Sequence, residues 1–294
     1  MSTYSITQLE KLTGIKAHTI RIWEQRYHLL NPERTDSNIR MYNDEELRKL
    51  LNTSLLISNG HKISKIASYS SGEISEIINK MISNQESSDL FSESIINQLI
   101  SSAFVFNELN FEKYFSMSIA KLGLKEAYMK IIYPMLVKLG MLWTTSEISP
   151  GQEHFITNLI RQKFFAAIDS LPLPTKAKRK WVLFLPEEED HETGLLFASF
   201  ILKKEGHQVI YLGPKVPYES LKEAIYFNQP TDLLFFLVKH QPKKAIQLLI
   251  KNLEKDFKKT SILACGKKDV FDGIKRKQKL QIVTSVEQFN LFIK

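Results

Sequence analysis

The last 120 residues alternate between short apolar segments and amphipathic segments, and this alternation constrains the fold more than any other feature of the chain. Runs of four to six mostly apolar residues predict strands, and the segments between them have helical spacing. The predicted strands are 181–185, 208–212, 233–238, 261–264 and 280–283. The predicted helices are 194–204, 218–227, 243–256 and 286–292. Because strands that alternate with helices form a parallel, doubly wound sheet, residues 175–294 are expected to be a five-stranded, flavodoxin-like α/β domain.

The predicted switch point of this sheet holds acidic residues and a histidine. Ligands of doubly wound sheets bind beyond the carboxyl ends of the strands, which here means the loop 186–191 and the loop after Val238. Glu189 stands two residues before His191, and Gly194 three residues after it. A metal-ligating imidazole is oriented by a carboxylate on its other nitrogen, and glycine admits a bulky macrocycle. The pattern therefore predicts a corrin site, with a surface histidine in an acidic loop as the alternative.

Residues 81–174 have helical spacing and no strand signal. The polar, serine-rich segment 81–90 is the best candidate for a linker, and the proline-rich segment 171–175 marks the next boundary. Between them lie four apolar stripes, of which the last covers about 150–168. We therefore expect a four-helix bundle as the middle domain of three, with boundaries 1–80, 81–174 and 175–294.

In the first 80 residues, the spacing of the apolar side chains predicts short helices joined by tight turns. Gly14 separates two segments with helical spacing, and Asn43 with Glu46 forms a capping-box pattern at the start of a third. Two helices joined by a short turn can place a recognition helix in the DNA major groove, although a small protein-interaction domain has the same spacing. The residues expected to contact DNA are Lys16, His18, Thr19, Arg21, Arg26, Arg34, Arg40 and Tyr42.

The net charge of +8 is concentrated in the C-terminal third. Residues 1–80 contain 11 basic and 9 acidic residues, residues 81–170 contain 7 and 9, and residues 171–294 contain 22 and 14. We interpret most of the C-terminal lysines as solvated side chains rather than as a nucleic-acid surface, because they fall near predicted helix ends and loops. Those lysines include Lys251, Lys255, Lys258, Lys259, Lys275 and Lys277.

Composition and local pattern exclude several classes of protein. Apolar runs are far shorter than the ~20 residues of a membrane-spanning helix, and no signal peptide is visible, so we expect a cytoplasmic protein without membrane contact. Cys265 is the single cysteine, which excludes an internal disulfide and a cysteine-rich zinc site. The chain has no paired carboxylates, no nucleophile with its base and no glycine-rich phosphate loop, so we do not expect an enzyme.

Three segments of the first 80 residues resemble the winged helix of MerR-type transcription regulators. They are residues 6–15 (ITQLEKLTGI), 19–34 (TIRIWEQRYHLLNPER) and 38–43 (NIRMYN). The wing of that family usually carries a glycine where this chain has Asn38, and asparagine also tolerates a positive φ. The resemblance implies a homo-oligomer, a dimer or a tetramer, that binds inverted repeats in double-stranded DNA. RNA polymerase or another protein is a further partner to consider.

With this head, the bundle and the α/β domain resemble the cobalamin-binding photoreceptor regulators of the CarH/LitR type over nearly the whole chain. In the bundle the resemblance rests on Trp143, which is followed after nine residues by Glu153 and His154. It implies that these three residues cover the upper face of adenosylcobalamin, against the adenosyl group. A bundle-core role for Trp143 and a helix-start role for His154 are the alternatives. Thr144 stands where light-responsive members can have a histidine.

In the α/β domain, the same resemblance implies that His191 is the lower axial ligand of cobalt and that Glu189 orients it. Further along, the family has Ser-x-Val/Leu lining the slot for the nucleotide tail of cobalamin, and this chain has Phe236 at the serine position. A later pair of glycines is replaced by Cys265 and Gly266. Both changes add volume, so we predict that Phe236 points toward the first helix of the domain and obstructs the tail slot.

Three functions remain open from the sequence. The leading one is a DNA-binding regulator whose C-terminal half senses adenosylcobalamin, or light through it, or descends from domains that did. The residues that favour it are Trp143, Glu153, His154, Glu189 and His191. The second is a regulator without a ligand that is controlled by protein partners, which the side chains of Phe236 and Cys265 favour. The third is a corrinoid carrier component of a methyltransferase. A carrier has no use for the segment 7–42, and the chain has no room for a catalytic barrel of ~250 residues.

Overall fold

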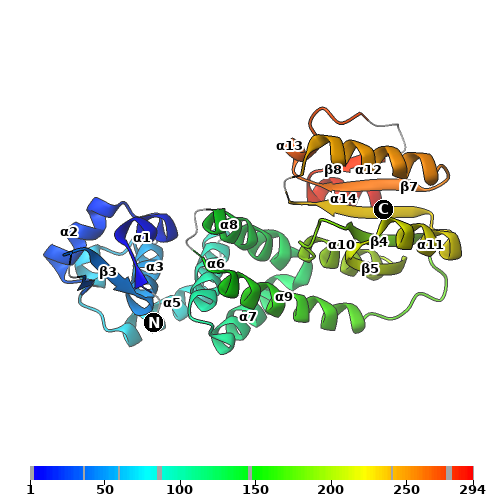
Figure 1. Cartoon of the computed structure of the whole chain (residues 1–294). Helices are drawn as coiled ribbons and strands as arrows, with labels where there is room; N and C mark the ends of the chain where they lie inside the picture. The colour runs from blue at the N-terminus through cyan, green and yellow to red at the C-terminus, as the bar shows by residue number, and fades with distance from the viewer. Residues whose placement is uncertain are drawn as a thin grey trace. The chain divides into compact units, whose positions relative to one another are not determined.

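The computed structural model describes residues 3–35, 37–58, 60–84, 88–144, 148–239, 241–275 and 280–293. The chain divides into two compact units, Met1–Ile156 and Thr157–Lys294, which contain the elements labelled in Figure 1. Within the described ranges, every helix is too short or too polar to cross a membrane. The predicted division into three domains stays a prediction.

The N-terminal unit begins with a winged helix, which confirms the predicted helix-turn-helix. In the small antiparallel sheet, β3 lies between β1 and β2. The predicted capping box starts α3, because Asn43 Oδ1 accepts the Glu46 N–H at 3.0 Å and Glu46 Oε2 accepts the Asn43 N–H at 2.9 Å. The elements are β1 (Thr3–Tyr4), α1 (Ile6–Thr13), α2 (Ala17–Tyr27), β2 (Glu33–Arg34), β3 (Arg40–Asn43), α3 (Asp44–Ser58), α4 (Ile63–Ile66) and α5 (Ser71–Asn84).

The helical segment that follows has the four expected helices. They are α6 (Ser88–Phe104), α7 (Glu108–Ala127), η1 with α8 (Tyr128–Ile132 and Tyr133–Thr144) and α9 (Pro150–Asp169). The third predicted helix therefore begins with a π-helical turn. The winged helix packs on this segment: the rings of Tyr4 and Phe104 meet edge to face at 5.8 Å, and Gln98 Nε2 donates to Asn52 Oδ1 at 2.9 Å.

The C-terminal unit contains a parallel five-stranded sheet with the order β5-β4-β6-β7-β8, which is the flavodoxin-like order that the sequence predicts. The described strands agree with the predicted ones to within a few residues at each end. The short helix α13 was not predicted, because four residues are too few to show helical periodicity. The elements are β4 (Lys180–Pro186), α10 (Thr193–Lys204), β5 (Gln208–Val216), α11 (Tyr218–Asn228), β6 (Asp232–Leu237), α12 (Lys243–Asp256), β7 (Ser261–Gly266), α13 (Lys268–Phe271), β8 (Leu280–Val283) and α14 (Val286–Ile293).

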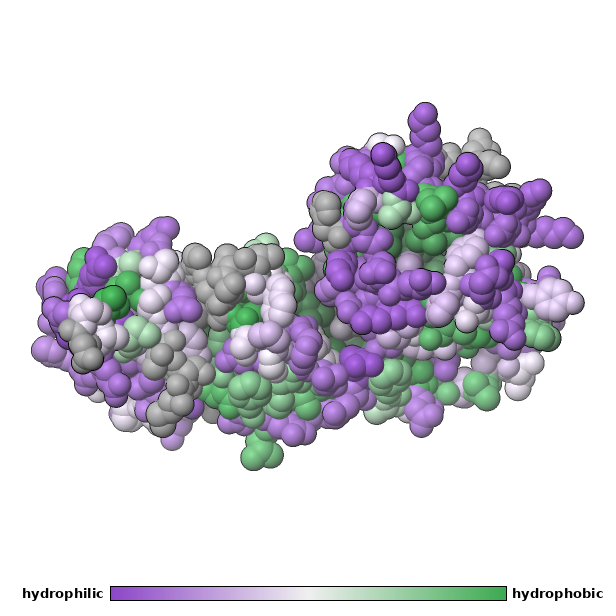
Figure 2. Space-filling view, viewed as in Figure 1, coloured by the Kyte–Doolittle hydropathy of each residue, from purple (hydrophilic) through white to green (hydrophobic). Residues whose placement is uncertain are grey.

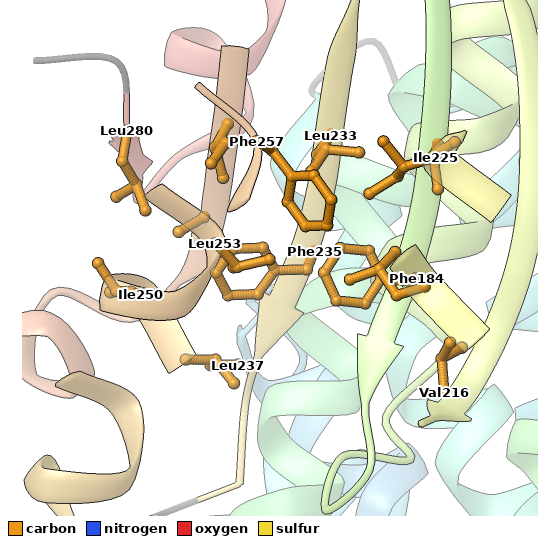
Figure 3. Packing of buried hydrophobic residues seen from close by; sticks show 14 of the residues in the cluster. Phe184, Val216, Ile225, Leu233, Phe235, Leu237, Ile250, Leu253, Phe257 and Leu280 are labelled. Atoms are coloured by element: carbon orange, nitrogen blue, oxygen red, sulfur yellow. The ribbon is translucent and has the colours of Figure 1, made fainter. Parts of the chain in front are cut away.

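One face of this sheet packs against α11 and α12 in a continuous apolar core (Figure 3). Phe235 of β6 stacks near Phe184 of β4, with ring centroids 5.5 Å apart. Leu233 and Leu237 belong to the same cluster. Because successive side chains of a strand point to opposite faces, the intervening Phe236 faces the other layer, where α10 lies.

The lysine-rich surface of this unit is solvated, as expected. In Figure 2 the visible face over α12 and α13 is mainly hydrophilic. The exposed side chains of this unit include Lys251, Lys255, Lys258, Lys259 and Lys275. Lys277, which the sequence prediction also included, lies outside the described residues.

Candidate functional site

The outward face of α2 carries several of the side chains that were predicted to contact DNA. Ile20 is fully buried and turns the opposite face of the helix toward the interior. This arrangement is the one that a recognition helix needs. Of the predicted contacts, Lys16, His18, Arg21, Arg26 and Arg34 are exposed, Thr19 and Arg40 are half-buried, and Tyr42 is buried.

Glu24 of α2 connects the recognition helix to the wing. Arg40 Nε donates to both Glu24 carboxylate oxygens, at 3.0 and 3.1 Å, and the Tyr42 hydroxyl donates to Oε2 at 3.0 Å. Burial and the neighbouring carboxylate of Glu24 raise the pKa of Tyr42. The prediction that Tyr42 contacts DNA is therefore wrong, because its side chain is fully buried. Tyr42 and Arg40 position the wing relative to α2.

The tip of the wing adopts the turn that the sequence predicts. Asn38 has a φ of +61°, so it occupies the left-handed conformation for which the family uses glycine. Its side chain accepts a hydrogen bond from Arg34 Nη1 at 2.6 Å. This contact fixes the exposed guanidinium of Arg34 on the wing.

At the switch point of the C-terminal sheet, the carboxylate of Glu189 is fully buried and binds four backbone N–H groups. Oε1 accepts from Asp190 and His191, both at 3.0 Å, and Oε2 accepts from Val238 at 2.7 Å and Lys239 at 2.8 Å. Burial alone would raise the pKa of Glu189, but the hydrogen bonds from His191 and from these amides lower it to about 2. Glu189 therefore joins the loop after β4 to the loop after β6.

The imidazole of His191 lies beside this carboxylate. Its Nδ1 is 2.5 Å from Glu189 Oε1 and 3.6 Å from Asp190 Oδ1, and its side chain is 53% exposed. An imidazole held through Nδ1 by a carboxylate ligates a metal through Nε2. The structure therefore confirms that Glu189 lies beside His191, and the role of His191 as a ligand of cobalt stays a prediction.

Phe236 fills the space that Gly194 leaves open. A Cβ added to Gly194 would lie 2.9 Å from Phe236 Cε1 and 3.2 Å from Cδ1, so the ring packs directly on the backbone at the start of α10. The structure thereby confirms that Phe236 points toward the first helix of the domain. Cys265 is its register partner on β7; it is buried, and burial raises the pKa of its thiol.

Gly266 has a structural explanation that needs no ligand. A Cβ added there would collide with the carbonyl oxygen of Leu237 and would come within 3.1 Å of Phe271 Cε2. The close approach of β6 and β7 therefore requires a glycine at this position.

An ion pair between a buried carboxylate and a half-buried arginine near this site was missed from the sequence. Glu192, only 5% exposed at its side chain, lies 2.6 Å from Arg161 Nε of α9 and accepts a hydrogen bond from the Tyr211 hydroxyl at 2.9 Å. The three residues lie far apart in the chain, so no local pattern could have indicated the contact. Glu192 directly precedes α10 and holds the helix start that carries Gly194.

The three predicted bundle residues lie at the end of α8 and the start of α9. Trp143 is 45% exposed, so the alternative of a bundle-core aromatic is wrong. His154 is more exposed, and its Nδ1 lies 2.6 Å from the carboxylate of the adjacent Glu153. The side chain of Thr144 lies outside the described part of the chain.

Comparison with known proteins finds family matches for two segments of the chain. Residues 4–73 match the MerR HTH family regulatory protein family, and residues 95–167 match the B12 binding domain family. The chain is 27% identical to the HTH-type transcriptional repressor CarH of Myxococcus xanthus over 230 residues, which cover 78% of this chain and 76% of that protein. It is 24% identical to the HTH-type transcriptional repressor CarA of the same organism over 229 residues, covering 78% and 74%.

A structural comparison supports the fold over 69% of the chain. The monomethylamine corrinoid protein of Methanosarcina barkeri superposes with a TM-score of 0.54 at 15% identity, covering 69% of this chain and 98% of that chain. At this identity the likeness concerns the fold alone. The chain thus has a winged helix that matches the MerR HTH regulatory protein family, a following segment that matches the B12 binding domain family, and similarity over most of its length to two HTH-type transcriptional repressors.

Proposed function

We propose that the chain is a regulator of transcription that binds double-stranded DNA through α2 and the wing, as a homo-oligomer on inverted repeats, and that its α/β domain acts without cobalamin. A protein partner would then control it in the cytoplasm, as a regulator and not as an enzyme. The observation that carries the second part is the packing of Phe236 on Gly194, 2.9 Å from the position of an added Cβ.

The residues of the α/β domain fit the cobalt centre of cobalamin but do not fit its nucleotide tail. His191 and Glu189 have the geometry for axial ligation of cobalt, which cobalamin would supply as its reactive centre. The nucleotide tail, however, would need the space between α10 and β6 that the ring of Phe236 fills. Because Glu189 also binds four backbone amides, its presence has a structural explanation apart from any cofactor.

Removing two arginines from the outward face of α2 is expected to weaken DNA binding at least tenfold. The Arg21→Ala, Arg26→Ala double variant loses two cations that would lie against phosphates or base edges, so the slope of log affinity against log salt should also fall by about 2. Gel shifts or fluorescence anisotropy across a salt series measure both effects. The matched control, Lys244→Ala with Lys251→Ala on α12, should bind DNA like the wild type. Equal binding by both double variants would contradict the assignment of α2 as the recognition helix.

The second candidate function is an adenosylcobalamin sensor, with light acting through the cofactor. The geometry of His191 and Glu189 favours it, and so does the exposed position of Trp143. In that function His191 would hold cobalt in the base-off form, with Trp143, Glu153 and His154 near the adenosyl group.

One experiment separates the two functions. The pure full-length chain is mixed with excess adenosylcobalamin in the dark and desalted, and its visible spectrum and DNA affinity are recorded before and after illumination. We expect no retained corrin absorption and the same DNA affinity in every condition. Retained corrin with a base-off spectrum that changes in His191→Ala would instead establish the sensor.

A further inference from the structure

Ile22 is an exposed apolar side chain in the middle of the recognition helix. It is 49% exposed, and on α2 it neighbours the exposed residues His18, Gln25 and Arg26, because residues three and four apart are neighbours on a helix. Within the described residues of the winged helix, Ile22 and Ile39 are the large apolar side chains with such exposure.

Exposure of one isoleucine carries no conclusion by itself, since single apolar residues are common on protein surfaces. The surroundings of Ile22 are what distinguish it. Its exposed neighbours are hydrogen-bond donors that would face the bases or phosphates of a duplex, so DNA binding would remove Ile22 from water as well. Binding would also remove water from the groups of the groove that face Ile22. An apolar group of the DNA in contact with Ile22 would offset the free-energy cost of that dehydration.

The charge of α2 supports a direct approach of this face to DNA. Glu24 is the sole acidic residue in the sequence of α2, and its carboxylate is turned toward Arg40 and Tyr42, with a side-chain exposure of 13%. The outward face around Ile22 therefore presents no carboxylate of its own helix to the phosphates. The same contacts fix α2 relative to the wing, so Ile22 has a defined position in the groove.

The major groove offers one apolar group, the C5 methyl group of thymine. We propose that Ile22 reads a thymine in each half-site through contact with this methyl group. The inference rests on the proposed DNA binding by α2 and adds a specificity-determining residue to it. Arg21 and the other cations would supply affinity, and Ile22 would distinguish thymine from a base without the methyl group.

The test uses uracil, which pairs as thymine does but lacks the methyl group. Binding sequences are selected from random duplex DNA with the full-length chain, and each thymine of the selected half-site is then replaced singly by uracil. We expect one position at which uracil raises the Kd of the wild type about fivefold, as for the loss of one buried methyl group. At that position Ile22→Ala should bind the thymine and uracil duplexes equally.

Ile39→Ala is the matched control, because Ile39 lies on the wing and is exposed to a similar degree, at 56%. This variant should keep the full uracil penalty. The inference is overturned if no thymine is sensitive to uracil, or if Ile22→Ala retains the penalty, while the chain still selects a sequence. Failure to select any sequence would instead contradict DNA binding itself and remove the basis of the inference. Circular dichroism of both variants checks that they fold.

Discussion

Replacing Phe236 with serine is expected to raise the affinity of the chain for adenosylcobalamin ten- to hundredfold. Tail binding in the wild type must displace a ring that packs on Gly194, and forcing extra volume into a packed site typically costs ~1–3 kcal/mol. Serine removes the ring, so this cost disappears. Cys265→Gly should add to the gain, because it enlarges the neighbouring position on β7. Titration followed by the visible absorption of the corrin measures the affinity.

The matched control is Phe235→Leu, which removes a ring from the adjacent position on the opposite face of β6. It should leave cobalamin affinity unchanged, because Phe235 belongs to the core against α11 and α12. Loss of the Phe236 ring could reduce stability by ~3 kcal/mol, so all proteins are compared at a temperature where each is folded. If the wild type binds tightly and Phe236→Ser weakens binding, Phe236 does not occupy the tail slot.

Glu189→Gln is expected to lower the free energy of unfolding of the C-terminal unit by about 3 kcal/mol at neutral pH. The pKa of Glu189 falls from an ordinary 4.5 to about 2 in the folded chain, and each pKa unit corresponds to ~1.4 kcal/mol. Since the folded-state pKa is the lower one, this stabilisation is fully present above about pH 4.5. It is lost as the pH falls toward 2. The glutamine variant should lack that part of the acid sensitivity, because an amide does not titrate there.

Tryptophan fluorescence can follow this unit by itself. Trp181 is fully buried in β4, and replacing Trp23 and Trp143 with phenylalanine leaves it as the single tryptophan. Denaturant unfolding is then compared between pH 7 and pH 3. Glu188→Gln is the matched control, because Glu188 is the exposed neighbour of Glu189, and it should change stability by less than ~0.5 kcal/mol. Equal losses in the two variants would contradict the role of the buried carboxylate.

Local sequence patterns predicted the helices and strands. Contacts between residues that are far apart in the sequence could not be predicted. The capping box of Asn43 and Glu46 could be found because its two residues are three apart. The orientation of Phe236 was expected from the family spacing alone, because the serine that it replaces lines the tail slot. In contrast, Glu24 meets Arg40 and Tyr42 across 16 and 18 residues, and this long-range contact made Tyr42 a buried residue instead of a DNA contact.

The candidate site divides in the same way. Glu189 and His191 are two positions apart in one loop, so the sequence itself indicated that their side chains lie close together. The amides of Val238 and Lys239 reach Glu189 from 49 and 50 residues away, because parallel strands bring their carboxyl ends to one edge. No sequence pattern indicates the contact between Glu189 and these two amides. The structural role of Glu189 could therefore be recognised only from the fold.

The four amides held by Glu189 have a consequence for how such chains evolve. Selection for stability alone would retain this glutamate after a lineage had stopped using a corrin, because loss of the carboxylate would leave buried amides without an acceptor. The acid-x-His-x-x-Gly pattern would then outlast its original ligand. A residue such as Phe236, which nothing in the loops requires, is therefore the better marker of whether an ancestral cofactor has been abandoned.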